Sequence, residues 1–424
     1  MFKTLRDAWR IPDLRKKIMF TLLILLLYRI GNVIPVPFID VATLSDYFNE
    51  TLSQTILGLY NAMSGSSFSQ ATVLALSIQP YINASIIVQL LTVAIPALER
   101  MAKDGGEEGK KKIEMITRIS TVALGLLMGW AYYAMLRNQG NIITDTSFVA
   151  ALGIILTFTA GSAVIMWLGE QITAHGIGNG ISMILFANII SGIPQSTQTL
   201  FSAQGFKYWQ MAVIAVGIAL MMIFIIFVND AERRIPIQYA KRVVGRKVYG
   251  GQSSNLPIKV SMSGVMPVIF AQSICSLPAT IATFCGMSPT NPWYVTVFAS
   301  TSWIYIAVYF VMIFFFGWFY ASIQYDPVEI ANNLKKNGGF IPGFRPGKPT
   351  ADFIKKVINK IIVFGSVYLG VVAMLPLIAG KFMPNFQYLA IGGTSLIIVV
   401  GVALETVKAL EAQMLMRHYK GFLD

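Results

Sequence analysis

LSIQPYINASIIVQLLT, residues 76–92, is apolar enough to enter a bilayer, yet it contains Gln79, Pro80, Asn83 and Gln89. Lipid offers no hydrogen-bond partner to such groups, so they occur at membrane depth only where protein covers them or where they line a water-filled cavity. The stretch therefore predicts a membrane helix with an interrupted, wetted entrance.

The composition places the whole chain in a membrane. Of its 424 residues 55% are hydrophobic and 12% charged, and the mean hydropathy is +0.63, whereas soluble domains have about 25% charged residues. Because about 20 apolar residues span a bilayer as a helix, we expect an all-α integral membrane protein. Ten transmembrane helices are predicted, over residues 18–35, 73–96, 115–135, 148–169, 180–200, 208–228, 262–284, 299–323, 355–378 and 388–408.

The distribution of charge orients these helices. If ten helices follow a cytoplasmic N-terminus, all but four of the 33 Lys and Arg residues lie on the cytoplasmic side. The exceptions are Arg29, Arg137, Lys207 and Lys381. This asymmetry is typical of the positive-inside rule, so we expect a multi-pass protein with both termini in the cytoplasm.

Two of the cytoplasmic loops are longer than orientation requires. Residues 229–260 and 324–354 are basic and rich in Gly and Pro, and apolar positions alternate around 235–239 and 243–249, which predicts a β-hairpin. Positive charge on long loops favours docking of a large anionic partner, either an RNA or an acidic protein.

The ten predicted helices divide into two halves of opposite orientation, residues 1–205 and 206–424. Five and five helices is the arrangement of inverted-repeat membrane proteins. Pro80-Tyr81-Ile82-Asn83-Ala84 in the second helix also matches Pro267-Val268-Ile269-Phe270-Ala271 in the seventh at three of five positions. We therefore predict two inverted five-helix halves around a central pore.

Motifs for catalysis and cofactors are weak. HGIGNG, residues 175–180, lacks the spacing of a dinucleotide loop and opens an apolar helix. His175 and His418 have no second ligand at metal spacing, and no Ser-His-Asp set or paired intramembrane Asp occurs. We expect neither an enzyme, nor a cofactor, nor a metal site.

The predicted helices have almost no ionisable residue at mid-membrane, where coupled transporters place them. Their polarity is uncharged and concentrated in the second, fifth and seventh helices, at Gln79, Asn83, Gln89, Thr92, Asn188, Gln272 and Ser273. A hydrated line of uncharged polar residues, with no ionisable residue to bind a coupling ion, favours a passive channel. The alternative is a secondary transporter for a small solute.

Six blocks, in the same order, resemble the SecY family of protein-conducting channels over essentially the whole chain. They are YRIGNVIPVP (28–37), SIQPYINASIIVQLL (77–91), WLGEQITAHGIGNGIS (167–182), QYAKRVVGRKVY (238–249), NNLKKNGGFIPGFRPG (332–347) and GGTSLIIVV (392–400). The resemblance implies an hourglass in the bacterial plasma membrane that passes unfolded polypeptides across, and releases transmembrane segments sideways between the second and seventh helices.

The resemblance also assigns residues to an outer plug, which is implied over about 61–71, to a pore ring and to a lateral gate. The plug residues are Met63, Ser64, Gly65, Ser66, Ser67, Phe68 and Ser69. The predicted ring is Ile78, Ile82, Leu185, Ile189, Ile269 and Ile398, in which Leu185 departs from the commoner isoleucine. The lateral gate set is Asn83, Ile86, Gln89, Thr92, Gln272 and Ser273. Without the resemblance, the spacing of Leu57, Tyr60, Met63 and Phe68 indicates a short amphipathic helix or an ordinary surface loop.

The partners implied by the resemblance are the SecE and SecG membrane subunits, the SecA motor ATPase, the ribosome, signal peptides, translocating polypeptides and membrane lipid, with no direct DNA contact. The docking residues for SecA and the ribosome would be Arg242, Arg246, Lys247, Lys335, Lys336, Arg345 and Lys348.

The orientation can be tested by labelling. In a background without Cys275 and Cys285, single cysteines at Gly250 and Gly347 should react with an impermeant thiol reagent only from the cytoplasmic side. A cysteine at Gln204 should react only from outside, because the charge asymmetry places it there. The reverse labelling pattern would contradict the orientation.

Overall fold

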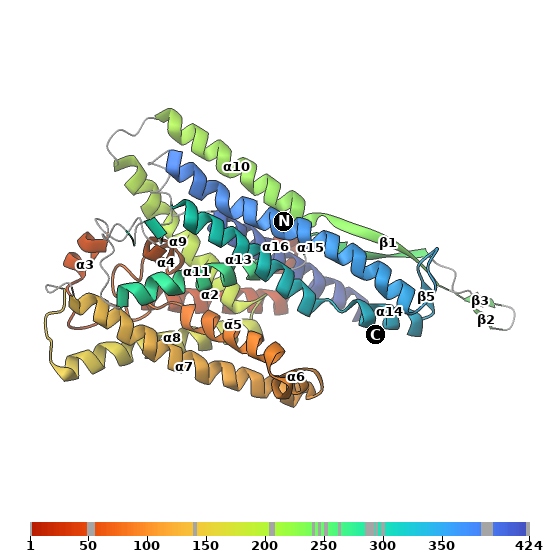
Figure 1. Cartoon of the computed structure of the whole chain (residues 1–424), viewed down its shortest axis with the longest axis horizontal. Coiled ribbons are helices and arrows are strands. Elements are labelled where there is room, and N and C mark those ends of the chain that lie inside the picture. Colours follow the sequence, from red (N-terminus) through yellow and green to blue (C-terminus); the bar gives the residue numbers. More distant parts are fainter. Residues whose placement is uncertain are drawn as a thin grey trace.

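The structure is a computed structural model. It describes residues 2–48, 56–138, 142–202, 208–239, 242–244, 247–249, 253–261, 264–284, 293, 296–297, 302–382 and 393–420. These residues are mainly helical, and long helices run roughly along the long axis of the molecule (Figure 1).

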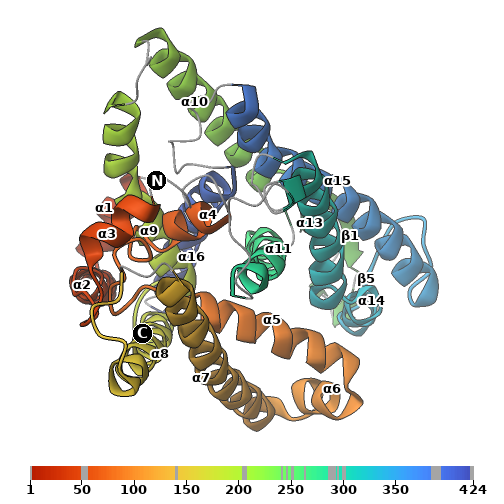
Figure 2. The same cartoon turned by 60° about the vertical axis from the view of Figure 1, so that its left-hand side comes forward.

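The N-terminal part contains α1 (Phe2–Arg10), α2 (Pro12–Gly31), α3 (Val41–Tyr47), α4 (Ile56–Met63), α5 (Gln79–Ala94), α6 (Pro96–Lys103), α7 (Gly106–Asn138), α8 (Phe148–His175) and α9 (Gly180–Ser202). The C-terminal part contains α10 (Tyr208–Asp230), α11 (Met266–Phe284), α13 (Trp303–Gln324), α14 (Pro327–Lys336), α15 (Lys348–Phe382) and α16 (Gly393–Lys420). Figure 2 shows α4 and α11 near the middle, between a group with α2, α5, α7 and α8 and a group with α10, α13 and α15.

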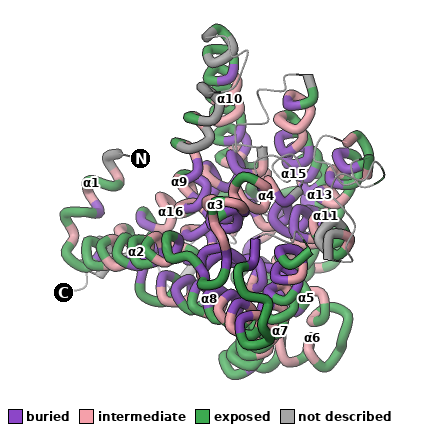
Figure 3. Tube along the Cα trace, turned by 90° about the vertical axis from the view of Figure 1, so that its left-hand side faces the viewer, coloured by how far each residue is buried: buried purple, intermediate pink, exposed green. Residues whose placement is uncertain are grey.

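Each of the ten predicted blocks overlaps one of these helices. Within the described residues, five helices are long and apolar enough to cross a membrane, or six if the bent pair α5 and α6 is one span. One helix outside this set is α2, whose apolar run is preceded by Arg15, Lys16 and Lys17. Large apolar side chains on the outside, such as Leu26 and Phe227, are 62% and 74% exposed, as a lipid-facing surface requires. The buried residues gather on the inward segments (Figure 3).

The second predicted block, 73–96, is not one straight helix. Residues 64–78 form turns, α5 begins at Gln79, and Pro80 is its second residue. Proline suits this position because the first amide groups of a helix have no partner within it. At the other end Ile95 is extended, Pro96 begins α6, and the two helices are bent by 105°, because a proline disfavours helical geometry in the preceding residue. Pro267 is likewise the second residue of α11.

Both segments predicted to form a β-hairpin contain strands, but the two segments pair with other partners rather than with each other. β1 (Glu232–Tyr239) pairs antiparallel with β4 (Ser253–Lys259), with Ile235 opposite Leu256, and β2 (Arg242–Val244) pairs with β3 (Lys247–Tyr249) at the tip. The second long loop adds β5 (Gly339–Phe340), which pairs with Gln238 and Tyr239 of β1. The two long loops therefore form one body, which projects from the helices (Figure 1).

Short-range contacts fix the segment between α2 and α5. Asp40 caps α3 by accepting hydrogen bonds from the Ala42 and Thr43 amides, and the Thr43 hydroxyl donates to it at 2.7 Å. The bond from this hydroxyl lowers the pKa of the Asp40 carboxyl. Pro35 and Thr72 form an isolated β-bridge, which joins the chain that follows α2 to the chain that precedes α5.

One close approach tests this packing. A Cβ atom added to Gly161 of α8 would lie 1.9 Å from the Val73 carbonyl oxygen, whereas one added to Gly153, on the same helix, would meet nothing within 4 Å. Gly161→Ala should lower stability by about 1–3 kcal/mol, because the backbone of residue 73 must move. Gly153→Ala is the matched control and should be neutral or stabilising. Thermal unfolding in detergent that is equal for the two variants would contradict the close approach.

Candidate functional site

All six predicted ring residues lie in one buried cluster. Ile78 precedes α5, Ile82 lies on α5, Leu185 and Ile189 on α9, Ile269 on α11 and Ile398 on α16, and each is at most 5% exposed. Residues four apart lie on the same face of a helix. Leu185 and Ile189 therefore share a face of α9. Ile78, the N-cap of α5, lies four residues before Ile82. Four segments that are distant in sequence thus contribute to one large apolar core, which also contains residues of α2, α8, α10, α13 and α15.

The predicted plug segment packs on this centre. α4 ends at Met63, which is 3% exposed and belongs to the same cluster as the six ring residues. Residues 64–70 then form turns, so the expected amphipathic helix covers only the first half of the segment. Phe68 turns to a second cluster, where its ring lies 4.5 Å from that of Tyr132 and 5.0 Å from that of Tyr60.

Polar contacts fix the segment to its walls. The Asn188 side chain, which is fully buried on α9, donates to the Met63 carbonyl at 3.0 Å and to the Ser77 hydroxyl at 3.3 Å. The Tyr132 hydroxyl donates to the Phe68 carbonyl at 2.5 Å, and the Tyr60 hydroxyl donates to the Leu76 carbonyl at 3.0 Å. Buried carbonyl groups need such donors, because an unpaired one costs about 1–3 kcal/mol.

Sequence reasoning gave no role in this segment to Arg29. Gly65 has φ +66°, and a Cβ there would lie 3.1 Å from Arg29 Nη1 and 3.2 Å from Asn188 Oδ1. Both atoms are buried and have no hydrogen-bond partner among the described residues. A lone arginine near the outer end of the first apolar block was the available signal, since a cation at that depth requires a polar site.

The structure divides the predicted lateral gate set. Ile86 belongs to the central cluster, and the Ser273 hydroxyl of α11 donates to Gln79 of α5 at 3.5 Å. Gln272 is buried beside it on α11. Within this part of the set, the contact of Ser273 with Gln79 links α11 to α5.

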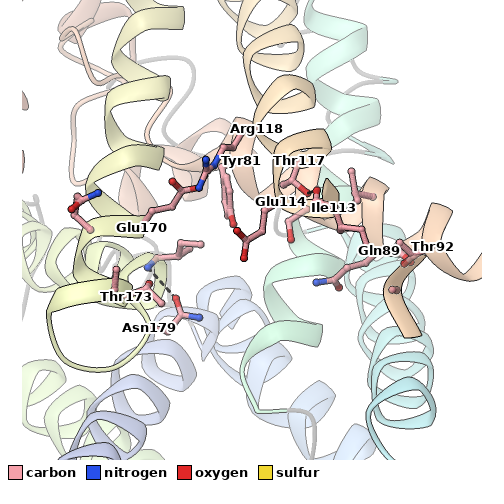
Figure 4. A pocket seen from close by; sticks show the side chains of 16 residues that line it. Tyr81, Gln89, Thr92, Ile113, Glu114, Thr117, Arg118, Glu170, Thr173 and Asn179 are labelled. Atoms are coloured by element: carbon pink, nitrogen blue, oxygen red, sulfur yellow. Dashed lines mark hydrogen bonds and ion pairs between the residues drawn. The ribbon is translucent and has the colours of Figure 1, made fainter. Parts of the chain in front are cut away.

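The remaining three residues of the set face elsewhere. The Asn83 amide contacts the Met128 sulfur of α7 at 3.9 Å, and Gln89 and Thr92 line a groove between α5, α7 and α8, which Figure 4 shows from close by. For these three residues, the described contacts are with α7 and with the groove between α5, α7 and α8, and not with α11, the seventh predicted helix.

The predicted docking residues divide between described and undescribed parts. Lys335 and Lys336 end α14, and both are exposed, as are Arg345 and Lys348. Arg242 lies on β2 and Lys247 on β3, while Arg246 lies outside the described residues. Because β5 joins β1, the two predicted docking loops share one surface.

No group of three or more His, Cys, Asp or Glu side chains that could hold a metal ion occurs in the part of the chain that the structure describes. The arrangement that is present consists of a buried aliphatic centre, a folded segment packed against it, and apolar helices around both. These features define a multi-pass helical membrane protein with a buried apolar centre.

Comparison with known proteins gives the family. The sequence profile of the SecY family matches residues 72–407, and the chain is 44% identical over 439 residues to the protein translocase subunit SecY of Streptomyces scabiei, with each chain covered completely. The chain belongs to the SecY family.

Solved structures share the fold. One described as the structure of a protein conducting channel has a TM-score of 0.68 at 18% identity, covering 94% of this chain and 92% of that chain. Another, Sec61 in the canine ribosome–channel complex from the endoplasmic reticulum, has a TM-score of 0.63 at 16% identity with the same coverage.

The contacts of Asn188 make a direct prediction. Asn188→Ala removes the donor to the Met63 carbonyl and should loosen the segment by about 1 kcal/mol or more. Amide hydrogen exchange in residues 64–72 should then become about tenfold faster, since local opening governs exchange there. Thr197→Ala is the control, because that hydroxyl donates only to the Ile193 carbonyl of its own helix. Unchanged exchange in the first variant would mean that the amide does not hold the segment.

Proposed function

We propose that this chain forms the pore of a protein-conducting channel, through which unfolded polypeptides cross a membrane. The burial of six aliphatic side chains and Met63 in one cluster carries the proposal. An aliphatic constriction excludes water and ions when closed, and it has no charge or fixed hydrogen-bond pattern that would select one peptide sequence over another. Membership of the SecY family supports the same function.

The architecture proposed for this function has ten transmembrane helices in two inverted halves, residues 1–205 and 206–424, with both termini in the cytoplasm. The correspondence of ten apolar blocks with helices supports it, as do the equivalent positions of Pro80 and Pro267 near the starts of α5 and α11. The membrane would be the bacterial plasma membrane, as the resemblance to bacterial SecY implies.

Within this architecture, residues 61–71 are the plug, and the six ring residues form the waist. The lateral gate is proposed between α5 and α11, with Ile86, Gln272 and Ser273 as members. We add Gln79 to this proposed gate, since its side-chain oxygen accepts a hydrogen bond from the Ser273 hydroxyl at 3.5 Å. Few polar contacts across a gate suit an interface that must open for an apolar transmembrane segment.

The basic body formed by the two long loops is proposed to dock cytoplasmic partners. A ribosome is supported by the fold shared with Sec61 of the canine ribosome–channel complex, and SecA by the family resemblance. SecE and SecG are proposed as bound membrane subunits. The chain itself is not proposed to catalyse a reaction, so ATP hydrolysis would take place in a motor partner.

The function can be tested with a pair of variants on α5. Ile82 is 4% exposed and lies in the central cluster, whereas Ile87, on the same helix, is 42% exposed. Ile82→Asn should hydrate the waist and shift the gate toward open by about 1–3 kcal/mol, which two closely balanced states would register. Ile87→Asn is the control, with the same chemical change on the outer surface.

The measurements are resting ion conductance in planar bilayers and export of precursors with defective signal sequences. Both should increase for Ile82→Asn and stay near the starting level for Ile87→Asn. Equal effects in the two variants would indicate general destabilisation of α5 and count against a ring. A purified, motor-supplied channel that moves no precursor would overturn the proposed function.

A further inference from the structure

A groove beside the central cluster has no role in the function described so far. It has a volume of about 600 Å³ and lies between α5, α7 and α8, with the start of α9 at its edge. Tyr81, Ser85, Gln89 and Thr92 of α5 line it at spacings of four, four and three residues, which is one face of a helix. The adjacent Ile82 points into the central cluster, so the groove and the constriction are neighbours through consecutive residues.

The groove is acidic. Glu114 and Arg118 of α7 and Glu170 of α8 are its charged side chains, so two carboxylates face one guanidinium. Arg118 Nε donates to Glu170 Oε1 at 2.8 Å, and Glu170 is 26% exposed. Glu114 has no ion-pair partner among the described residues and is exposed. The net negative charge therefore belongs to an accessible carboxylate, while the other carboxylate is already paired.

Tyr81 completes this arrangement. Its ring points between the two carboxylates, with the hydroxyl directed to the same part of the groove as the Glu114 side chain (Figure 4). A carboxylate that accepts hydrogen bonds, a phenolic oxygen next to it and the amide of Gln89 on the same wall offer several acceptors to one donor group. An ammonium or guanidinium has three to five N–H donors and no acceptor.

The net charge of the side chains that line the groove is negative, whereas the net charge of the whole chain is positive. The net charge is +13, and the exposed loops near the cytoplasmic side are basic. A cationic segment that approaches such a surface is repelled until it reaches a negative site, and in the proposed orientation this groove lies on the cytoplasmic side of the constriction, at the beginning of α7 and the end of α8.

From these observations we propose that the groove binds a cationic group of the entering polypeptide, a lysine, an arginine or the N-terminal ammonium, with Glu114 as the principal contact and Tyr81 beside it. The proposal rests on the proposed channel function. It assigns to the groove the task of holding the positively charged end of a substrate on the cytoplasmic side while an adjoining apolar segment reaches the gate between α5 and α11.

The test uses the chain in nanodiscs with the membrane subunits that co-purify with it. Two N-acetylated synthetic peptides share one leucine-rich core that carries a photoreactive leucine, and they begin with either two lysines or two glutamines. A photoreactive residue at Ser85 reports occupancy of the groove, and the photoreactive leucine of the peptide reports engagement of the channel anywhere.

At low ionic strength the lysine peptide should cross-link at Ser85 about two- to fivefold more than the glutamine peptide, the range expected for one accessible ion pair. Added salt should remove the difference, because the pair is solvent-exposed. Glu114→Gln should abolish it, and Glu108→Gln, an exposed position near the start of α7 that does not line the groove, should preserve it. Arg118→Gln frees Glu170 and should increase the difference, which general damage to the site would not do.

Equal cross-linking of the two peptides at Ser85, or no effect of Glu114→Gln, would overturn the groove proposal while the core cross-link keeps the channel function. Cross-linking of Ser85 to a resident membrane subunit with and without peptide would also overturn it, because the groove would then be a subunit interface. Loss of every peptide cross-link, core included, would refute the proposed function itself.

Discussion

Residues 64–78 impose the constraint on which the rest of this structure depends, because an irregular backbone lies enclosed among helices. Lipid cannot satisfy its polar groups, so the protein must. Tyr132 and Asn188 supply donors from two different helices, and the Val73 amide donates to the Ile34 carbonyl at 2.9 Å. Ser66, Ala71 and Ser77 take positive φ values of 68°, 42° and 50°, a conformation that costs non-glycine residues energy and persists only where the surroundings hold it.

Two kinds of interaction, apolar burial and hydrogen bonding, hold this segment in place. Burial of Met63 with the six aliphatic side chains is favourable in proportion to area and has no preferred direction, so it excludes water without fixing an orientation. The hydrogen bonds of Asn188 are directional and few, so they fix where the segment sits. This division would suit the proposed plug, because an apolar contact can be broken and remade, and water can replace the few hydrogen bonds that fix its position.

The sequence predicted the helices well, since long apolar runs are strong signals. The six predicted ring positions came from the resemblance alone, and the structure places all of them in one large apolar cluster. It did not predict that α5 begins at Gln79 with turns before it, because residues 73–78 are as apolar as a helix. Nor did it predict that β5 joins β1, because pairing between distant strands leaves no local trace. The resemblance assigned Gln89 and Thr92 of α5 to a gate facing the seventh predicted helix, α11, but the direction of their side chains depends on where α5 starts and how it packs on α7.

Basic and acidic side chains lie at separate places on the molecule. The pairing of β1 with β5 fixes the two basic loops to one body, so their charges act together on a large anionic partner, over a range of about 10 Å at moderate salt. In the groove proposal, a cationic peptide end is repelled by that basic body and attracted at Glu114. The proposed binding of the partner and of the substrate would then use opposite charges at separate places. The uncharged cluster beyond the groove has no preference for either sign, so a bound cation would stay on the cytoplasmic side while the apolar segment that follows it moves to the gate.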